Sequence, residues 1–223
     1  MDDTSTRGLE GILRAPIYAF DFRFMIGDVK DFLEFSEINI AWQLRRELQA
    51  IAHRTDFDDL PAGYREHLEE TAKHRFGVSL PLRVRYAATL AFATSVEWAA
   101  RILNLESRAC VQEVKGSNHT VSILRELSIR TRVQTNGTID DFEALVNVRN
   151  CIAHSAGIVE TYRFKELLPT AIARLEGFSL DNWHAFGPQV CIRRGALDKL
   201  IDAAEALVVD LHRAMHEQGL MRS

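Results

Sequence analysis

The feature that most constrains the fold is the regular spacing of apolar residues in one long segment. From Asp28 onward they recur every three or four residues, which places them on one face of an α-helix. These positions are Val29, Phe32, Leu33, Phe35, Ile38, Ile40, Leu44 and Leu48. The spacing predicts a long amphipathic helix from Asp28 to about His53, preceded by a polar leader over residues 1–16 that Pro16 ends.

Turn and capping residues divide the chain into further helices. A charged helix opens at residues 56–61, runs to about Arg75 and is expected to stop at Gly77. Ser79 resembles a helix N-cap with Pro81 in the first turn, and the helix that it opens should run to about Leu105. Other helices are expected near 119–131, over 138–154 with a capping box of Thr138 and Asp141, over 163–175 and over 196–215.

Composition supports a helical globular protein. The 223 residues are 47% hydrophobic and 26% charged, with only five prolines and twelve glycines, fewer than a many-turned β-sandwich would need. We therefore expect an all-α fold, an antiparallel up-and-down helical bundle that forms a single domain. Residues 79–215 would form the core bundle and 1–77 an N-terminal helical extension. The irregular stretch 178–194 is the exception, because residues 189–192 are able to pair with 179–181 as a small β-hairpin.

Charge and cysteine content exclude several classes of protein. The formal net charge of −4 argues against broad coating of nucleic acid, although it leaves room for a local basic cleft. The three cysteines, Cys110, Cys151 and Cys191, form no C-x-x-C pair, which argues against a disulfide framework or a thiolate zinc site. No secretory signal or membrane-spanning run is evident, so we expect a cytoplasmic protein without a membrane partner.

Arg149 is an unexpected charge in the helix predicted over 138–154. At 100° per residue, with Phe142 at 0°, the apolar arc runs from about 240° to about 40°, and Arg149 falls inside it near 340°. Asn150 and His154 lie at its edge, near 80° and 120°. Either the arginine extends its guanidinium to water along an apolar stem, or it is paired or faces a polar cavity.

Glu97 is the second unexpected charge, because it is the only charged residue between Tyr86 and Ala100. A helix this apolar is expected to be central and mostly buried, so the carboxylate needs a cationic partner. Arg101, four residues on, is the local candidate, and Arg149 is the alternative from another helix. We expect Glu97 and Arg149 to contact each other across two packed helices, within about 6 Å.

The segment from Arg149 to His154 reads R-N-x-x-x-H and resembles the signature of the HEPN superfamily (higher eukaryotes and prokaryotes nucleotide-binding). That signature is an arginine, often followed by a polar residue, and a histidine after four to six intervening positions; here four intervene. The helix carrying Glu97, Trp98 and Arg101 also resembles the second conserved helix of the family. The resemblance covers roughly residues 79–215. It implies a helical bundle that dimerises and brings two copies of the motif to one cleft.

The resemblance also implies a metal-independent endoribonuclease without a cofactor, of the kind found in toxin–antitoxin, antiviral-defence or RNA-processing systems. Its partners would be RNA, a second copy of the chain and an antitoxin or regulator. His154 suits proton transfer and Arg149 suits a charged phosphorane, while Asn150 would orient the imidazole or bind phosphate. The expected products are a 2′,3′-cyclic phosphate and a 5′-hydroxyl.

Two other interpretations stay open at this stage. The second is a non-catalytic HEPN-like module that binds RNA, a nucleotide or a partner protein. The third and weakest is an unrelated helical bundle in which the short motif arises by chance. Cys151 within the motif invites comparison with cysteine nucleophiles, but it falls near 180°, away from the apolar arc, and has no evident partner. Four histidines, His53, His67, His74 and His212, lie on charged helical faces and are expected to be solvated.

Overall fold

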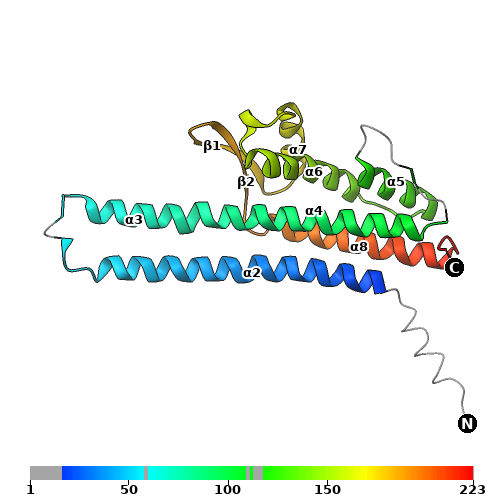
Figure 1. Cartoon of the computed structure of the whole chain (residues 1–223), viewed down its shortest axis with the longest axis horizontal. Coiled ribbons are helices and arrows are strands. Elements are labelled where there is room, and N and C mark those ends of the chain that lie inside the picture. The colour runs from blue at the N-terminus through cyan, green and yellow to red at the C-terminus, as the bar shows by residue number, and fades with distance from the viewer. Residues whose placement is uncertain (1–16, 58–59, 109–110, 113–117, 223) are drawn as a thin grey trace, which may run out of the picture.

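The computed structural model describes residues 17–57, 60–108, 111–112 and 118–222, and it is mostly helical (Figure 1). The expected all-α class with a small hairpin is confirmed. The elements are α2 (Ile17–Ala52), α3 (Tyr64–His74), the π-helical turn η2 (Arg75–Ser79), α4 (Leu80–Glu106), α5 (His119–Thr131), α6 (Thr138–Ser155), the short 3₁₀ turns η3 (Val159–Thr161) and η4 (Lys165–Leu167), α7 (Leu168–Arg174), β1 (Phe178–His184), β2 (Gly187–Ile192) and α8 (Ala196–Glu217). The expected leader lies outside the described residues.

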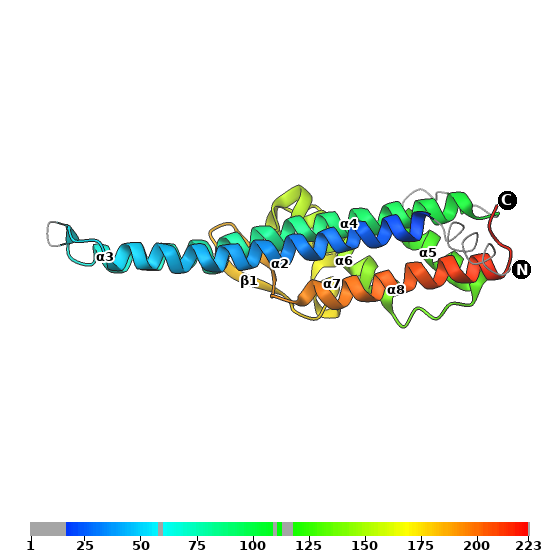
Figure 2. The ribbon, with the colours of Figure 1, turned by 90° about the horizontal axis from the view of Figure 1, so that it is seen from below.

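A long helical hairpin dominates the molecule, with α2 antiparallel to the continuous run of α3, η2 and α4 (Figures 1 and 2). The expected start at Asp28 was wrong, because α2 begins at Ile17. Phe22 and Ile26 are fully buried and extend the apolar spacing toward the N-terminus. Gly27, which lies within the helix, does not interrupt it.

The expected helix stop at Gly77 was also wrong. Residues 64–106 are helical throughout, and Gly77 lies within η2, where the N–H of Leu80 donates to the carbonyl of Arg75. Pro81 has no N–H to donate, and the wider π turn just before it accommodates this loss without ending the helix. Ser79 accordingly has helical dihedral angles and no capping hydrogen bond, and the helix begins at Tyr64 rather than near residue 56.

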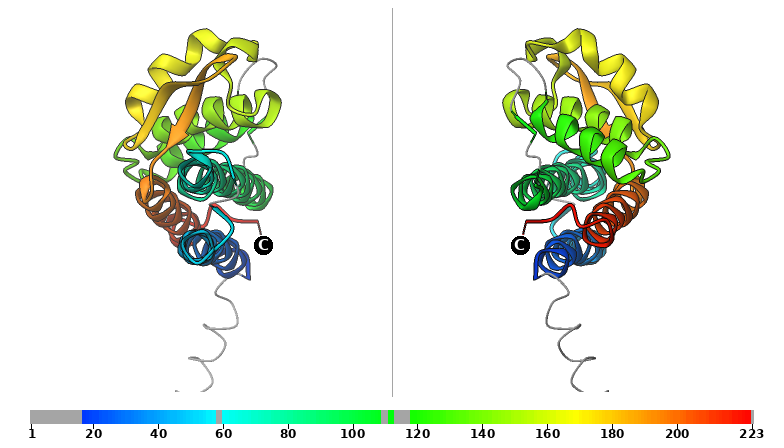
Figure 3. Two further views of the ribbon diagram at one scale, coloured as in Figure 1. Left: turned by 90° about the vertical axis from the view of Figure 1, so that its left-hand side faces the viewer. Right: turned by 90° about the vertical axis from the view of Figure 1, so that its right-hand side faces the viewer.

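The central element is α4, as its apolar sequence predicts. It packs against α2 and α8 on one side and against α5 and α6 on the other (Figure 3). Glu37 of α2 is 12% exposed and forms ion pairs with Arg85 at 2.7 Å and Arg194 at 2.9 Å. Arg85 also donates to the carbonyl of Ile192, so this cluster ties the long hairpin to the end of β2.

The remaining elements follow the expected ranges closely, with two differences: the helix expected over 163–175 is shorter, since only α7 is α-helical there, and the start of α6 is capped differently. The predicted hairpin is confirmed, since Ser179 pairs with Cys191 and Asp181 with Gln189. The expected capping box at Thr138 was wrong, because Gly137, with a φ of 83°, occupies the N-cap position and no side chain caps the helix. Asp141 instead pairs with Arg174 at 2.7 Å. Among the described residues, no helix combines the length and the apolar character needed to span a membrane.

His212 corrects the expectation that four histidines are solvated. His53, His67 and His74 are exposed, but His212 is only 7% exposed on α8. It lies four residues after buried Val208 and so shares the buried stripe of the helix. Burial lowers the pKa of His212, repulsion by His216 lowers it further, and Glu106 opposes the shift.

Stability should therefore fall in mildly acidic solution. The folded-state pKa of His212 lies below the unfolded-state value of about 6.5. At pH values between these two pKa values, the unfolded chain therefore binds more protons than the folded chain. The free energy of unfolding is expected to decrease as the pH falls below that value, until the folded-state pKa is reached. Urea denaturation between pH 7.5 and 5.5 measures the slope. H212L should flatten it and H67A, which changes an exposed histidine on α3, should not; equal slopes in wild type and H212L would contradict the assignment.

Candidate functional site

The R-N-x-x-x-H motif lies in the C-terminal half of α6, beside the middle of α4. The nitrogen Nη2 of Arg149 donates to both carboxylate oxygens of Glu97, at 3.0 Å and 2.9 Å. Each of these side chains is 23% exposed. These distances confirm the expected contact between Glu97 and Arg149. The contact is favourable because each partly buried charge compensates the other.

Asn150 is the second partner of the arginine. Its oxygen Oδ1 accepts a hydrogen bond from Nη1 of Arg149 at 2.9 Å. With Glu97 on one nitrogen and Asn150 on another, the guanidinium is held in one orientation. It has more N–H donors than these three bonds use, so donors are left for a phosphate group.

His154 is exposed in the last turn of α6, five residues after Arg149. Five helical residues correspond to a rotation of about 140°, so the imidazole and the guanidinium leave α6 in different directions. Arg101, the other candidate partner of Glu97, is exposed on α4, and within the described chain it forms no ion pair. The structure therefore brings together Glu97, Arg149 and Asn150, while His154 and Arg101 lie at the surface near them in sequence.

Cys151 is buried, although we expected it to lie away from the apolar arc. Its side chain is fully buried, because η3 and the residues after α6 fold back over this side of the helix. Burial raises the pKa of the Cys151 thiol to about 11, so at neutral pH it stays protonated. A nucleophilic role for this cysteine is therefore not supported.

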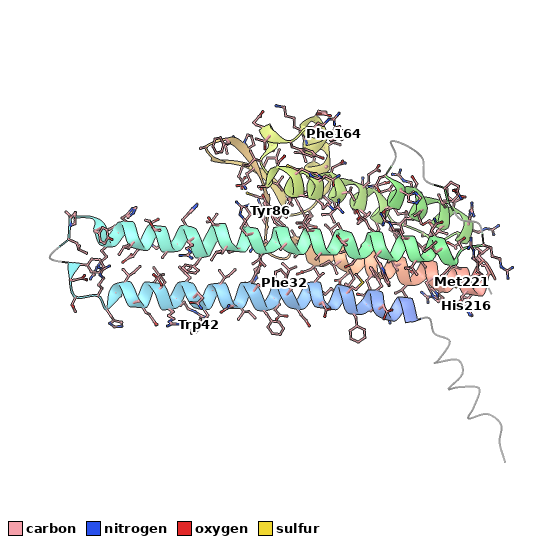
Figure 4. The ribbon with its side chains drawn as sticks, viewed as in Figure 1. Phe32, Trp42, Tyr86, Phe164, His216 and Met221 are labelled. Atoms are coloured by element: carbon pink, nitrogen blue, oxygen red, sulfur yellow. The ribbon has the colours of Figure 1, made fainter. Side chains whose placement is uncertain are left out.

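The end of α6 is fixed by contacts that the sequence analysis missed. The hydroxyl of Tyr86 on α4 donates to the carbonyl of Val190, and the N–H of Val190 donates to the carbonyl of Gly157 at 2.9 Å. Figure 4 shows Tyr86 on the side of α4 that faces the β-hairpin. The side chain of Gln189 also donates to the carbonyl of Ala156 at 3.1 Å. In the sequence, Gly157 just after the predicted helix end indicated a turn. It did not indicate which residues contact that turn.

An uncovered strip of α4 lies next to Glu97. Ala87, Ala91 and Thr94 are exposed there, and Leu90 and Trp98 are partly exposed. A shallow cavity of about 610 Å³ is formed by Ala87, Leu90, Ala91, Thr94 and Ser95 with Met25, Asp28, Val29 and Phe32 of α2. Small side chains of this kind let a second helix approach closely.

A larger cavity of about 740 Å³ lies at the N-terminal ends of α6 and α8, lined among others by Thr138, Arg174 and Lys199. Most charged side chains that line it form ion pairs within the chain. Arg174 pairs with Asp141 at 2.7 Å, and Lys199 pairs with Glu176 at 2.6 Å. Arg149, Asn150 and His154 line neither cavity. No group of three or more metal-binding side chains occurs among the described residues.

Comparison with known proteins does not assign a family. No family model or curated protein matches the sequence, and no solved structure matches the fold. The resemblance of the motif to the HEPN superfamily therefore stays a prediction.

Proposed function

We propose that this protein is a metal-independent endoribonuclease of the HEPN type, acting in the cytoplasm as a toxin or antiviral-defence effector under the control of an antitoxin or regulatory protein. The observation that carries the proposal is the held arginine at the surface of the bundle. Glu97 and Asn150 fix Arg149 while the exposed His154 follows on the same helix. RNA cleavage without a metal needs a base for the 2′-hydroxyl, a group that stabilises the additional phosphate charge and a proton donor for the leaving oxygen. His154 suits the first of these roles and Arg149 the second.

The chemistry uses the nucleophile that RNA carries. His154 takes the proton of the 2′-hydroxyl, whose oxygen then attacks the adjacent phosphorus, and Arg149 stabilises the additional negative charge. The bond from phosphorus to the 5′-oxygen breaks, and that oxygen receives a proton, from the His154 of the other subunit or from water. The products are a 2′,3′-cyclic phosphate and a 5′-hydroxyl, and no redox step or metal is involved.

A second subunit completes the site in this proposal. Arg149 and His154 diverge by about 140° around α6, so one copy of the motif does not enclose a phosphate. The strip of α4 with Ala87, Ala91 and Thr94 adjoins Glu97 and suits close packing against its symmetry mate. Such a pair brings two Arg149 guanidiniums to one cleft, each held by its Glu97 and each with N–H donors left for a phosphate.

Purified wild-type protein is expected to cleave single-stranded RNA in the presence of EDTA. The ends of the fragments identify the mechanism, because a cyclic phosphate resists a phosphatase that removes only monoesters until acid opens the ring. Fragments ending in a 3′-hydroxyl would contradict the mechanism. Tight RNA binding without turnover would instead favour a non-catalytic HEPN-like module, in which the pairing of Arg149 with Glu97 is purely structural.

A further inference from the structure

The outer face of α2 exposes a row of large apolar side chains. Phe24, Phe35, Ile38 and Trp42 are 56%, 69%, 52% and 48% exposed, and Phe32 at the edge of the row is 44% exposed. No other helix of the described chain exposes as many large apolar side chains. Figure 4 shows Trp42 on the side of α2 that faces away from α4. A row of large exposed apolar side chains along one helix indicates an interaction site.

The row follows a regular helical repeat. At 100° per residue, Phe24, Phe35 and Trp42 lie within about 20° of one another, and Ile38 lies about 40° to one side. Successive positions on this face, at residues 24, 28, 31, 35, 38 and 42, are alternately four and three apart, the spacing by which two helices pack along a seam. This row, with Phe32 and the charged residues of the same face, is called the α2 stripe below.

We propose that the α2 stripe pairs with the α2 stripe of a second copy of the chain, with the two helices antiparallel. The distribution of charges along the stripe favours a second copy of the chain as the partner. The N-terminal half of the stripe carries Asp28 and Asp31, and the C-terminal half carries Arg45 and Arg46, all four of them exposed. Within the described chain none of the four forms an ion pair; Arg46 stacks on Trp42, 5.5 Å from the ring centre. An antiparallel pair places each acidic half against a basic half, whereas a parallel pair sets like charges together.

The charges and the apolar residues define a single register. Residues 28 and 46 are equidistant from Glu37, and residues 31 and 45 are equidistant from Ile38. A two-fold axis that crosses α2 between Glu37 and Ile38 therefore brings both aspartates to within one residue of the facing arginines of the other copy. The same axis lays Trp42 of one copy against the turn of the other copy that contains Phe32 and Phe35. Charge and apolar contact thus select the same arrangement.

The size of the stripe suits a dimer contact. From Phe24 to Trp42 the helix extends about 27 Å at 1.5 Å per residue. The four aromatic side chains, each of roughly 200 Å² and about half exposed, offer about 400 Å² per copy. Two copies, with Ile38 and the charged rim added, reach the roughly 1,000 Å² that a specific interface needs.

This contact is separate from the pairing proposed for the nuclease. Trp42 of the stripe lies on the side of α2 that faces away from α4 (Figure 4), whereas the motif lies where α4 meets α6. Asp28 and Phe32 of the stripe also line the cavity beside the uncovered strip of α4. The contact does not depend on catalysis. With both present, the chain forms assemblies larger than a dimer.

Cysteine cross-linking of the full chain tests the register. In a background with Cys110 and Cys191 changed to serine, I38C should be trapped as a covalent dimer by oxidation or by a short bis-maleimide. The matched control is F24C, which is equally exposed but about 40 Å from its own copy in this register. Strong cross-linking of I38C with little of F24C supports the proposal. Absence of cross-linking at I38C, or equal yields at both positions, overturns it.

Charge reversal tests the orientation in the same background. One chain carries I38C with D28R and D31R, and the other carries I38C with R45D and R46D. Each chain alone should cross-link at least about tenfold less than I38C, because like charges then oppose each other. A mixture should restore the yield as a heterodimer. Undiminished cross-linking of either chain alone would overturn the antiparallel arrangement, and circular dichroism checks that these surface changes leave the fold intact.

Discussion

Replacing His154 with alanine is expected to reduce RNA cleavage by a factor of about 10² to 10⁴, the usual contribution of a general acid or base. The folded state should be nearly unaffected, because His154 is exposed and its removal leaves no cavity. Initial rates on single-stranded RNA in EDTA measure the effect. The matched control is H216A, which removes an exposed histidine from the last turn of another long helix, α8, and should cleave like wild type.

Arg149 needs a different design, because its replacement also leaves Glu97 partly buried without a partner. R149A is expected to lose activity and also some stability, so its loss of activity alone would be ambiguous. The double variant with E97A removes both charges and should recover stability without recovering cleavage. Cleavage by H154A at the wild-type rate would contradict the role proposed for His154. Recovery of cleavage in the R149A and E97A double variant would contradict the role proposed for Arg149.

The contact between Glu97 and Arg149 was predictable because it follows from local energetics. Each charge interrupts an apolar helical face, an unpaired charge there is costly, and few opposite charges were available to pair with it. The hairpin of β1 and β2 was also predictable from apolar runs bounded by Gly177 and Gly187. In the first case the information lies in the apolar surroundings of each of the two charges, and in the second it lies in one short stretch of sequence.

Features that depend on context were not predictable. Gly77 satisfies the rule for a helix end, but the π turn continues the helix through it. His212 lies among charged neighbours in sequence, yet the packing of α8 buries it. In the proposed mechanism a second subunit completes the site of His154 and Arg149, and the motif itself does not specify how two copies would meet there.

Replacing Gly157 with alanine is expected to lower the free energy of unfolding by about 3 kcal/mol, from two effects. The first is backbone strain, because the φ of Gly157 is +81° and an L-residue there costs about 1–2 kcal/mol. The second is overlap, since a Cβ would lie 2.7 Å from Cζ of Tyr86 and closer still to its hydroxyl oxygen. Tyr86 is 4% exposed and bonded to Val190, so overpacking adds about 1–3 kcal/mol.

Gly63 is the matched control for this change, because its φ of +84° is nearly the same and nothing lies within 4 Å of a Cβ built there. G63A should therefore show the backbone strain alone, and the difference between the two variants in urea denaturation isolates the contact with Tyr86. Equal losses in both would mean that Tyr86 yields freely and does not fix the end of α6. The expected larger loss in G157A would instead mean that α4, through Tyr86, holds the turn three residues beyond His154, so that the helix bearing Glu97 also sets where the imidazole stands.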